Sequence, residues 1–229
     1  MEKDVIISVT SYGVTENDKG IVGYARMVFE GKYAVNNIEI RENASGELYT
    51  KMPHYQSRNS SGRLEDRDVF YAKDKEVSNM ISGAIIEEYS YTKQHISTGS
   101  YKMLEDKKFE ISDVVVRPFS SEKNDKTRGA CDIDFGDFKV RNGYMSELPN
   151  GQGKLVTNFQ AQKRVLFDSE TNDGVEKWVN NFAPVNHEAS EELRNAVTKA
   201  YNAHISRDAA QTEVKTEEVA RPKSKFGRR

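Results

Sequence analysis

Two stretches of twenty residues decide the fold: FYAKDKEVSNMISGAIIEEY at 70–89 and FAPVNHEASEELRNAVTKAY at 182–201. Both begin with Phe and end with Tyr, and the same offset of 112 aligns Asp74 with Asn186, two residue types that cap helix N-termini. Apolar side chains then recur at helical spacing, at Val77, Met80, Ile81, Ala84 and Ile85 and at Leu193, Ala196, Val197, Ala200 and Tyr201. The sequence therefore predicts two equivalent helices, each with one apolar stripe.

The repeat extends upstream of each helix. GYARMVF (23–29) matches GACDIDF (129–135), YAVNN (33–37) matches FKVRN (138–142), and GELYTKMP (46–53) matches GKLVTNFQ (153–160). Alternating apolar residues in these segments are typical of half-buried strands, and VIISVTSYGV (5–14) and ISDVVVRPFS (111–120) supply a first strand in each copy. The predicted class is α+β, with two tandem units, each a small antiparallel β-sheet on which a C-terminal helix packs.

The order and spacing of these segments resemble the stage V sporulation protein G (septation protein) family, over residues 4–91 and 109–205. The aromatic-x-Pro-apolar-Asn opening of the second helix carries the resemblance best, although Ala72 replaces that Pro in the first copy and Phe159-Gln160 replaces the expected Met-Pro in the second. The resemblance implies a cytoplasmic bacterial protein that binds DNA and RNA and regulates gene expression. Because such single-unit proteins pair as dimers, it also implies an intramolecular pseudo-dimer, otherwise a monomer.

The predicted boundaries are a first unit at 1–92, a linker at 93–108, a second unit at 109–206 and a disordered basic tail at 207–229. The tail is poor in large apolar residues, which opposes folding on its own. Its last nine residues, RPKSKFGRR, carry five cations and no acid, although the whole chain has a net charge of −2. The chain is thus a mildly acidic body with a basic end.

The loop before the first helix, PHYQSRNSSGRLEDRD (53–68), interleaves cations with an aromatic residue, a pattern suited to phosphate contact and base stacking. The candidate nucleic-acid-binding residues in it are His54, Tyr55, Arg58, Arg63 and Arg67. In the alternative interpretation the loop is merely solvated, and Glu65, Asp66 and Asp68 neutralise its cations.

The other candidates are Lys163 and Arg164 in the second loop, Lys93 and Arg207 after the helices, and Arg221, Lys223, Lys225, Arg228 and Arg229 in the tail. The family resemblance points to the cations after each helix, although cations there would also stabilise a helix C-terminus. The tail could bind phosphates by counterion release, or it could serve only solubility.

Other classes find less support. No apolar run is long enough for a membrane span, and we expect no secretory signal. The single Cys131 fits a reducing cytosol and a core position. DFG at 134–136 lacks the other kinase motifs, and alternation makes Asp132 and Asp134 strand-surface residues, so we expect no enzyme, metal or cofactor. Trp178 is expected to pack. We predict a nucleic-acid-binding regulator; the alternative is a scaffolding factor in septum or spore formation.

Overall fold

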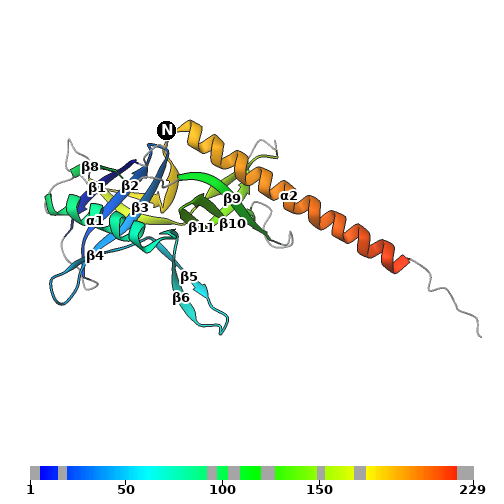
Figure 1. The fold of residues 1–229 in the computed structure, drawn as a ribbon, viewed down its shortest axis with the longest axis horizontal. Helices are drawn as coiled ribbons and strands as arrows, with labels where there is room; N and C mark the ends of the chain where they lie inside the picture. Colours follow the sequence, from blue (N-terminus) through cyan, green and yellow to red (C-terminus); the bar gives the residue numbers. More distant parts are fainter. Residues whose placement is uncertain are drawn as a thin grey trace, which may run out of the picture.

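A computed structural model describes residues 6–14, 20–91, 97–102, 109–119, 127–148, 153–167 and 174–220 of the chain (Figure 1). The first half contains β1 (Ile6–Gly13), β2 (Ile21–Phe29), β3 (Tyr33–Glu42), β4 (Leu48–Lys51), β5 (His54–Arg58), β6 (Leu64–Asp68), β7 (Phe70–Ala72), α1 (Lys75–Tyr91) and β8 (Ser97–Lys102). The second half contains β9 (Phe109–Pro118), β10 (Thr127–Gly136), β11 (Phe138–Glu147), β12 (Leu155–Asn158), β13 (Ala161–Phe167), β14 (Gly174–Asn180), β15 (Phe182–Pro184) and α2 (His187–Ala220). The predicted α+β class is confirmed.

Two main sheets form, one for each half of the chain. The first sheet has the order β15-β3-β2-β1-β8 with β4 also on β3, and the second has the order β12-β11-β10-β9 with β7 also on β11. The pairs β5–β6 and β13–β14 form separate two-stranded hairpins. These hairpins occupy the segments that the sequence analysis treated as variable loops.

The two halves exchange their shortest strands. Phe182 of β15 pairs with Val35 of β3 in the first sheet. Phe70 of β7 pairs with Val140 of β11 in the second sheet. Each helix is therefore preceded by a strand that belongs to the sheet of the other half. Both segments were seen in the sequence only as the residues before each helix, so neither these strands nor their pairing partners in the other half were predicted.

A shared aromatic core lies between the halves. Phe29 from β2 stacks on Phe109 from β9 with ring centroids 4.2 Å apart, and Phe109 stacks on Phe135 from β10 at 4.6 Å. Tyr33 from β3 meets Phe135 edge-on at 5.1 Å. All four side chains are buried. Because these rings form one continuous cluster, neither sheet has an apolar core separate from the other.

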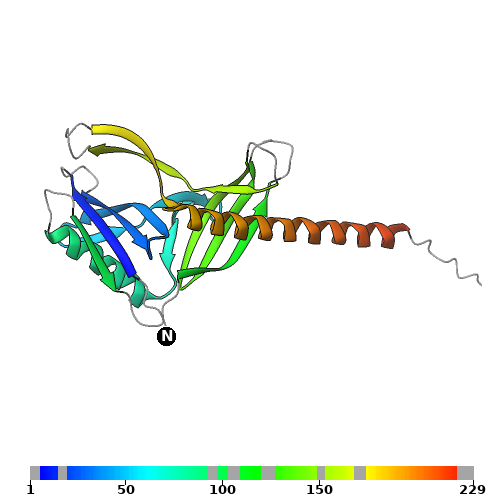
Figure 2. The ribbon, with the colours of Figure 1, turned by 90° about the horizontal axis from the view of Figure 1, so that it is seen from above.

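The helices begin where the sequence predicts. The Asp74 carboxylate accepts from Glu76 N–H at 2.7 Å, and the Asn186 side-chain oxygen accepts from Ala189 N–H at 2.8 Å, so both predicted caps are confirmed. α1 packs on β1 and β4, and α2 packs on β9 and β12 (Figure 2). The stripes are confirmed by Ile81 and Val197, which are buried against their sheets.

Two predicted boundaries differ from the structure. Residues 97–102, assigned to the linker, form β8 and pair antiparallel with β1. Residues 207–220, assigned to the disordered tail, continue α2 to Ala220, and this part of the helix extends away from the body (Figure 1). Composition misled the second prediction, because the segment lacks large apolar residues but is rich in Ala and Glu, which favour helix without burial.

Candidate nucleic-acid interface

The β5–β6 hairpin projects from the body (Figure 1). Its turn is fixed by Asn59, whose side-chain oxygen accepts hydrogen bonds from the N–H groups of Ser61 and Arg63, both at 3.0 Å. Gly62 adopts a φ of 79°, which glycine tolerates best. The segment predicted as a flexible loop is therefore an ordered hairpin with two distinct faces.

One face of this hairpin turns toward the second sheet. Tyr55 pairs across the hairpin with Arg67 and packs partly against the shared core. Burial raises the Tyr55 pKa; Asp132 raises it further, whereas nearby cations, among them Arg141 of β11, lower it. The ring that the sequence suggested for base stacking is thus half-buried at the base of the hairpin, facing strands of the other half.

The second sheet carries cations there that the sequence analysis missed. Two guanidinium nitrogens of Arg117 in β9 donate to the carboxylate oxygens of Asp132 at 3.0 and 2.7 Å. Arg141 stacks over the Tyr71 ring at 4.1 Å and donates to its hydroxyl at 2.7 Å. Alternation along the strands could have identified them, since Arg141 follows the buried Val140 and Arg117 follows the half-buried Val116. Near Tyr55 they form an arginine-tyrosine surface.

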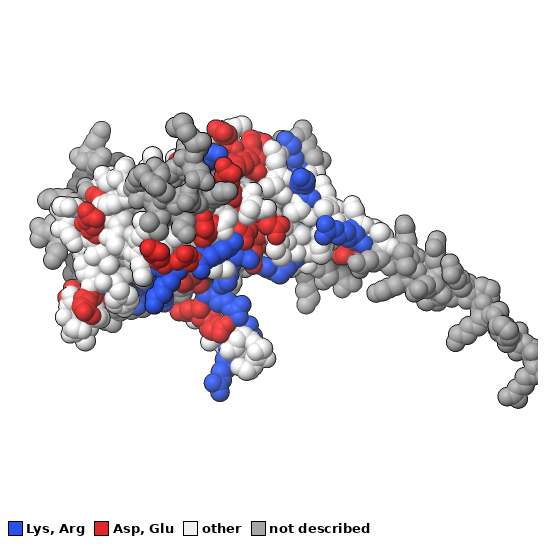
Figure 3. Space-filling model, in the orientation of Figure 1, with Lys and Arg blue, Asp and Glu red and all other residues white. Residues whose placement is uncertain are grey.

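The tip and outer face of the same hairpin hold the remaining predicted cations. Arg58 donates to the Gly62 carbonyl at 2.8 Å, and Arg63 is exposed at the turn. Arg67 pairs with Glu65 at 2.5 Å. In Figure 3, Lys and Arg side chains gather where the hairpin leaves the body and at its tip, with acidic side chains between them.

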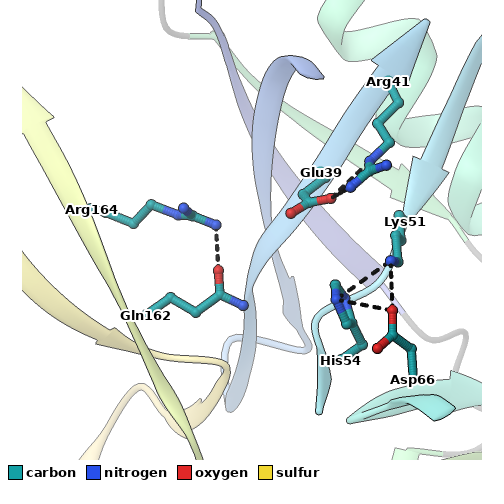
Figure 4. Close-up of polar contacts among 7 residues, drawn as sticks. All are labelled: Glu39, Arg41, Lys51, His54, Asp66, Gln162 and Arg164. Carbon is teal, nitrogen blue, oxygen red and sulfur yellow. Dashed lines mark hydrogen bonds and ion pairs between the residues drawn. The ribbon is translucent and has the colours of Figure 1, made fainter. Parts of the chain in front are cut away.

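His54 lies at the base of the hairpin rather than free in solvent. Its Nε2 atom is 3.6 Å from a carboxylate oxygen of Asp66, which Lys51 also contacts at 3.3 Å (Figure 4). The Lys51 hydrogen bond holds the pKa of the Asp66 carboxyl below its ordinary value. Acids of the hairpin thus pair with Lys51, His54 and Arg67, which agrees with the alternative interpretation that acids neutralise the cations of this segment. Arg58 and Arg63, in contrast, have no carboxylate partner among the described residues.

The second hairpin, β13–β14, lies against the first sheet through Arg164. Its guanidinium stacks over the Tyr24 ring at 4.0 Å, and its Nε donates to the Asn37 side-chain oxygen at 3.0 Å. It also donates to Gln162 on its own strand at 2.5 Å (Figure 4). Asn37 in turn donates to the Val179 carbonyl of β14 at 3.0 Å. The predicted binding residue Arg164 therefore anchors the hairpin to the first sheet.

Lys163 and Trp178 lie on the opposite, outward face of this hairpin. The two residues are cross-strand partners, and the Trp178 side chain is 72% exposed. Lys163 contacts Glu176 of β14 at 2.5 Å. The expectation that Trp178 packs is wrong, because strand alternation turns Arg164 toward the sheet and thereby Lys163 and Trp178 toward solvent.

The remaining predicted residues are dispersed. Arg207 is exposed on α2, beside the His204–Asp208 ion pair of 3.3 Å. Lys93 and the tail cations Arg221, Lys223, Lys225, Arg228 and Arg229 lie outside the described residues. The structure therefore places the described candidates on two hairpins and one helix rather than in one patch.

The aspartates of β10 are engaged by protein groups. Burial favours a higher Asp132 pKa, but hydrogen bonds from Arg117 and Asn142 N–H outweigh it, so the pKa lies below its ordinary value. Asp134 accepts from Lys73 at 2.7 Å and from Ser112 at 2.9 Å. No group of His, Cys, Asp and Glu suited to a metal ion occurs among the described residues.

Comparison with known proteins bears on the first unit. Residues 4–91 match the family model described as SpoVG, so the resemblance seen in the sequence is confirmed for that unit. The second unit lies outside the match. No curated protein and no solved structure matched the chain. In the described part of the chain, neither helix has the length and apolar character that crossing a bilayer requires.

Proposed function

We propose that the chain binds DNA or RNA with modest sequence selectivity and regulates gene expression in the cytoplasm. The observation that carries the proposal is the outward pair on β13–β14, where Trp178 is 72% exposed directly across from Lys163. Indole rings stack on bases of any sequence, and a neighbouring ammonium group binds phosphate. Arg164 on the opposite face of the same strand holds the hairpin against the first sheet, so the exposed indole is presented on an ordered strand.

The other hairpin supplies a second contact region. Arg58 and Arg63 are exposed at its outer end, and Arg117 and Arg141 lie on the sheet beneath its base. A strand of nucleic acid could follow the hairpin from tip to sheet, with phosphates on the arginines and a base against Tyr71 or Tyr55. Fixed arginines on a rigid hairpin suit modest selectivity.

Binding in this mode is weak and sensitive to salt. Arg67, Arg117 and Lys163 each have a carboxylate partner in the free protein. A phosphate must compete with that carboxylate, so each contact contributes less than one from a free cation. Few net counterions are released, and the logarithm of affinity falls by about 0.9 per phosphate contact for each logarithmic unit of salt.

The arrangement of the two units supports a covalent pseudo-dimer. The reciprocal pairing of β7 with β11 and of β15 with β3 relates the halves as two subunits of a symmetric dimer are related. It would carry one hairpin from each half, and a single nucleic-acid strand could contact both.

In the test, Trp178 is both the fluorescent reporter and the side chain proposed to stack on a base. Full-length protein is titrated with labelled single-stranded RNA and DNA at low salt, following anisotropy and Trp fluorescence. We expect quenching that parallels anisotropy, and Trp178→Ala should weaken binding by about 5- to 100-fold if one base stacks. Tyr49→Ala, which removes an exposed aromatic residue on β4, is the control. Absence of binding to either nucleic acid, or equal affinity of both variants, contradicts the proposal.

A second candidate function is protein interaction in septum or spore formation. Many surface cations are paired with carboxylates, as in Lys73–Asp134 and Arg128–Glu147, and this pairing favours the second candidate. Paired cations attract phosphate weakly, whereas a surface of mixed charge can bind a polar surface of another protein. Recovery of the tagged chain from lysate with and without nuclease separates the two. Partners that remain after nuclease treatment, with no nucleic acid in the untreated sample, favour the second candidate.

A further inference from the structure

The two sheets differ at one edge. In the first sheet β1 is covered by β8, with Val9 opposite Gly99. In the second sheet β9 holds the equivalent place, since Val114 faces Ile133 as Val9 faces Met27. Within the described residues β9 pairs with β10 alone, so its outer edge has no partner strand.

The backbone groups along this edge follow from one hydrogen bond. Phe119 N–H donates to the Arg128 carbonyl at 3.0 Å, which makes these two residues a hydrogen-bonded pair of the β9–β10 ladder. Because antiparallel ladders alternate, every second residue of β9 points its N–H and C=O groups away from β10. The residues whose groups point outward are Ser112, Val114, Val116 and, through its carbonyl alone, Pro118.

A groove runs beside the same edge. It lies between β9 and α2. Its apolar lining residues are Ile111, Val114, Ala196, Ala200 and Ala203, and Asp113 and Lys199 also line it. Ala200 holds the place that Glu88 holds in the first unit, where Tyr101 of β8 reaches the Glu88 carboxylate at 2.8 Å. The groove therefore corresponds to the space that β8 covers in the first unit. Val115 and Phe119 are also exposed here, at 44% and 48%.

We propose that the β9 edge binds the β9 edge of a second copy of this chain, antiparallel, with Val115 opposite Val115 of the second copy. The N–H and C=O groups of Val114 then form hydrogen bonds with the C=O and N–H groups of Val116 of the second copy. Val116 forms the same pair with Val114 of the second copy. Ser112 N–H meets the carbonyl of Pro118, which has no N–H to offer. Each outward-facing group from Ser112 to Val116 that can donate or accept is used except the Ser112 carbonyl.

Charge selects this register. It places Asp113 opposite Arg117 of the second copy, at both ends of the pairing. Asp113 is exposed and has no ion pair among the described residues, and the half-exposed Arg117 guanidinium has donors beyond the two that Asp132 uses. A shift of two residues either way sets both charges opposite apolar residues, and a shift of four sets like charges opposite each other. A shift of one breaks the hydrogen-bond alternation.

The grooves between β9 and α2 lie away from the centre of this pairing. Each groove is lined by Ile111–Val114 and not by Val115, so the two grooves lie on opposite sides of the centre of the joined sheet. With a rise of about 3.3 Å per residue, their β9 segments are centred about 16 Å apart. The sequence alone predicted a monomer, because the open edge is visible only once β8 is seen to cover its counterpart.

The experiment measures self-association of the full chain by sedimentation equilibrium up to about 0.5 mM, the range in which a small interface associates. We expect a monomer–dimer equilibrium. Asp113→Arg places like charges opposite at both ends and should weaken it by about 10-fold or more. Glu110→Arg makes the same charge change on β9 beyond the paired residues and is the matched control.

Hydrogen exchange locates the contact. The Val114 and Val116 amides should gain protection at high protein concentration and lose it on dilution. A chain that stays monomeric, a dimer equally weakened by both variants, or a dimer with these two amides unprotected overturns the proposal. Protection that arises only with a different protein means that the edge accepts a foreign strand, which also overturns it.

Discussion

Phe109 stacks on Phe29 with ring centroids 4.2 Å apart and planes 7° from parallel, and the two residues belong to different halves of the repeat. Both are buried. The contact joins the first strand of the second half to the second strand of the first half, so loss of either ring destabilises both sheets.

Phe109→Ala should therefore destabilise the whole chain by about 3–5 kcal/mol through the cavity it leaves. We expect one cooperative unfolding transition for wild type and variant, because the aromatic core is continuous. Urea unfolding followed by Trp178 fluorescence and by far-UV circular dichroism checks this. Two separate transitions would show that the halves fold independently.

Arg164→Lys should loosen the β13–β14 hairpin without unfolding the sheets. An ammonium group keeps the charge but not the fork that reaches Asn37 and Gln162 while stacking on Tyr24. We expect a loss of about 1–2 kcal/mol and faster amide exchange in the hairpin. Lys163→Ala, on the exposed face of the same strand, is the control and should cost less than about 0.5 kcal/mol.

Acid should weaken the fold partly through Asp132. Its pKa in the folded chain lies below the unfolded value of 3.8, so its contribution is fully present above that value and is lost as pH falls through the folded pKa. Asp132→Asn should reduce stability at neutral pH by about 1–3 kcal/mol. It should also flatten the fall in stability below about pH 4. Equal slopes for variant and wild type would assign the acid sensitivity to other groups.

The Cys131 thiol should be unreactive in the folded chain. Burial raises its pKa to about 12, so almost no thiolate exists near neutral pH. Labelling with a disulfide reagent should proceed at the rate of unfolding and accelerate in urea. Rapid labelling of the native protein would mean that β10 opens locally far more often than its buried position suggests.

Deletion of residues 221–229 should weaken nucleic-acid binding without changing the melting temperature. The segment carries five cations and lies outside the described residues. Contacts to phosphate carry little base information, so affinity for all sequences should fall by a similar factor and the salt slope should flatten. Charge reversal of Arg58 and Arg63 should instead change which sequences are preferred. Unchanged affinity after the deletion would make the tail a solubility segment.

Local patterns predicted most of the regular structure. Period-two alternation identified β2, β3, β10 and β11, and the apolar stripes with Asp74 and Asn186 identified both helices. These signals are strong because burial on one face forces the periodicity. β8 was missed because STGSYK is an edge strand with little apolar alternation, so its sequence carries no such signal.

What remained hidden depends on partners distant in sequence. Three residues such as Phe70–Ala72 are too few to show alternation, so the sequence predicted neither this strand nor the sheet that accepts it. Arg164 and Lys163 are equivalent cations in the sequence. Only the orientation of the hairpin on the first sheet shows that Arg164 anchors it and that Lys163 is exposed. Arg117 and Arg141 became candidates only when the β5–β6 hairpin was seen near them.

In the pseudo-dimer that we propose, joining the two units covalently removes a constraint that identical subunits impose. In an assembly of two identical chains, any substitution appears twice, so both hairpins must change together. Here Arg164 anchors one hairpin, whereas the aligned position in the other is occupied by Ser57, and Arg58 and Arg63 occur on one hairpin only. The reciprocal strands preserve the shared scaffold while the residues of each hairpin can change independently. One chain can therefore carry two different binding hairpins in a fixed relative orientation.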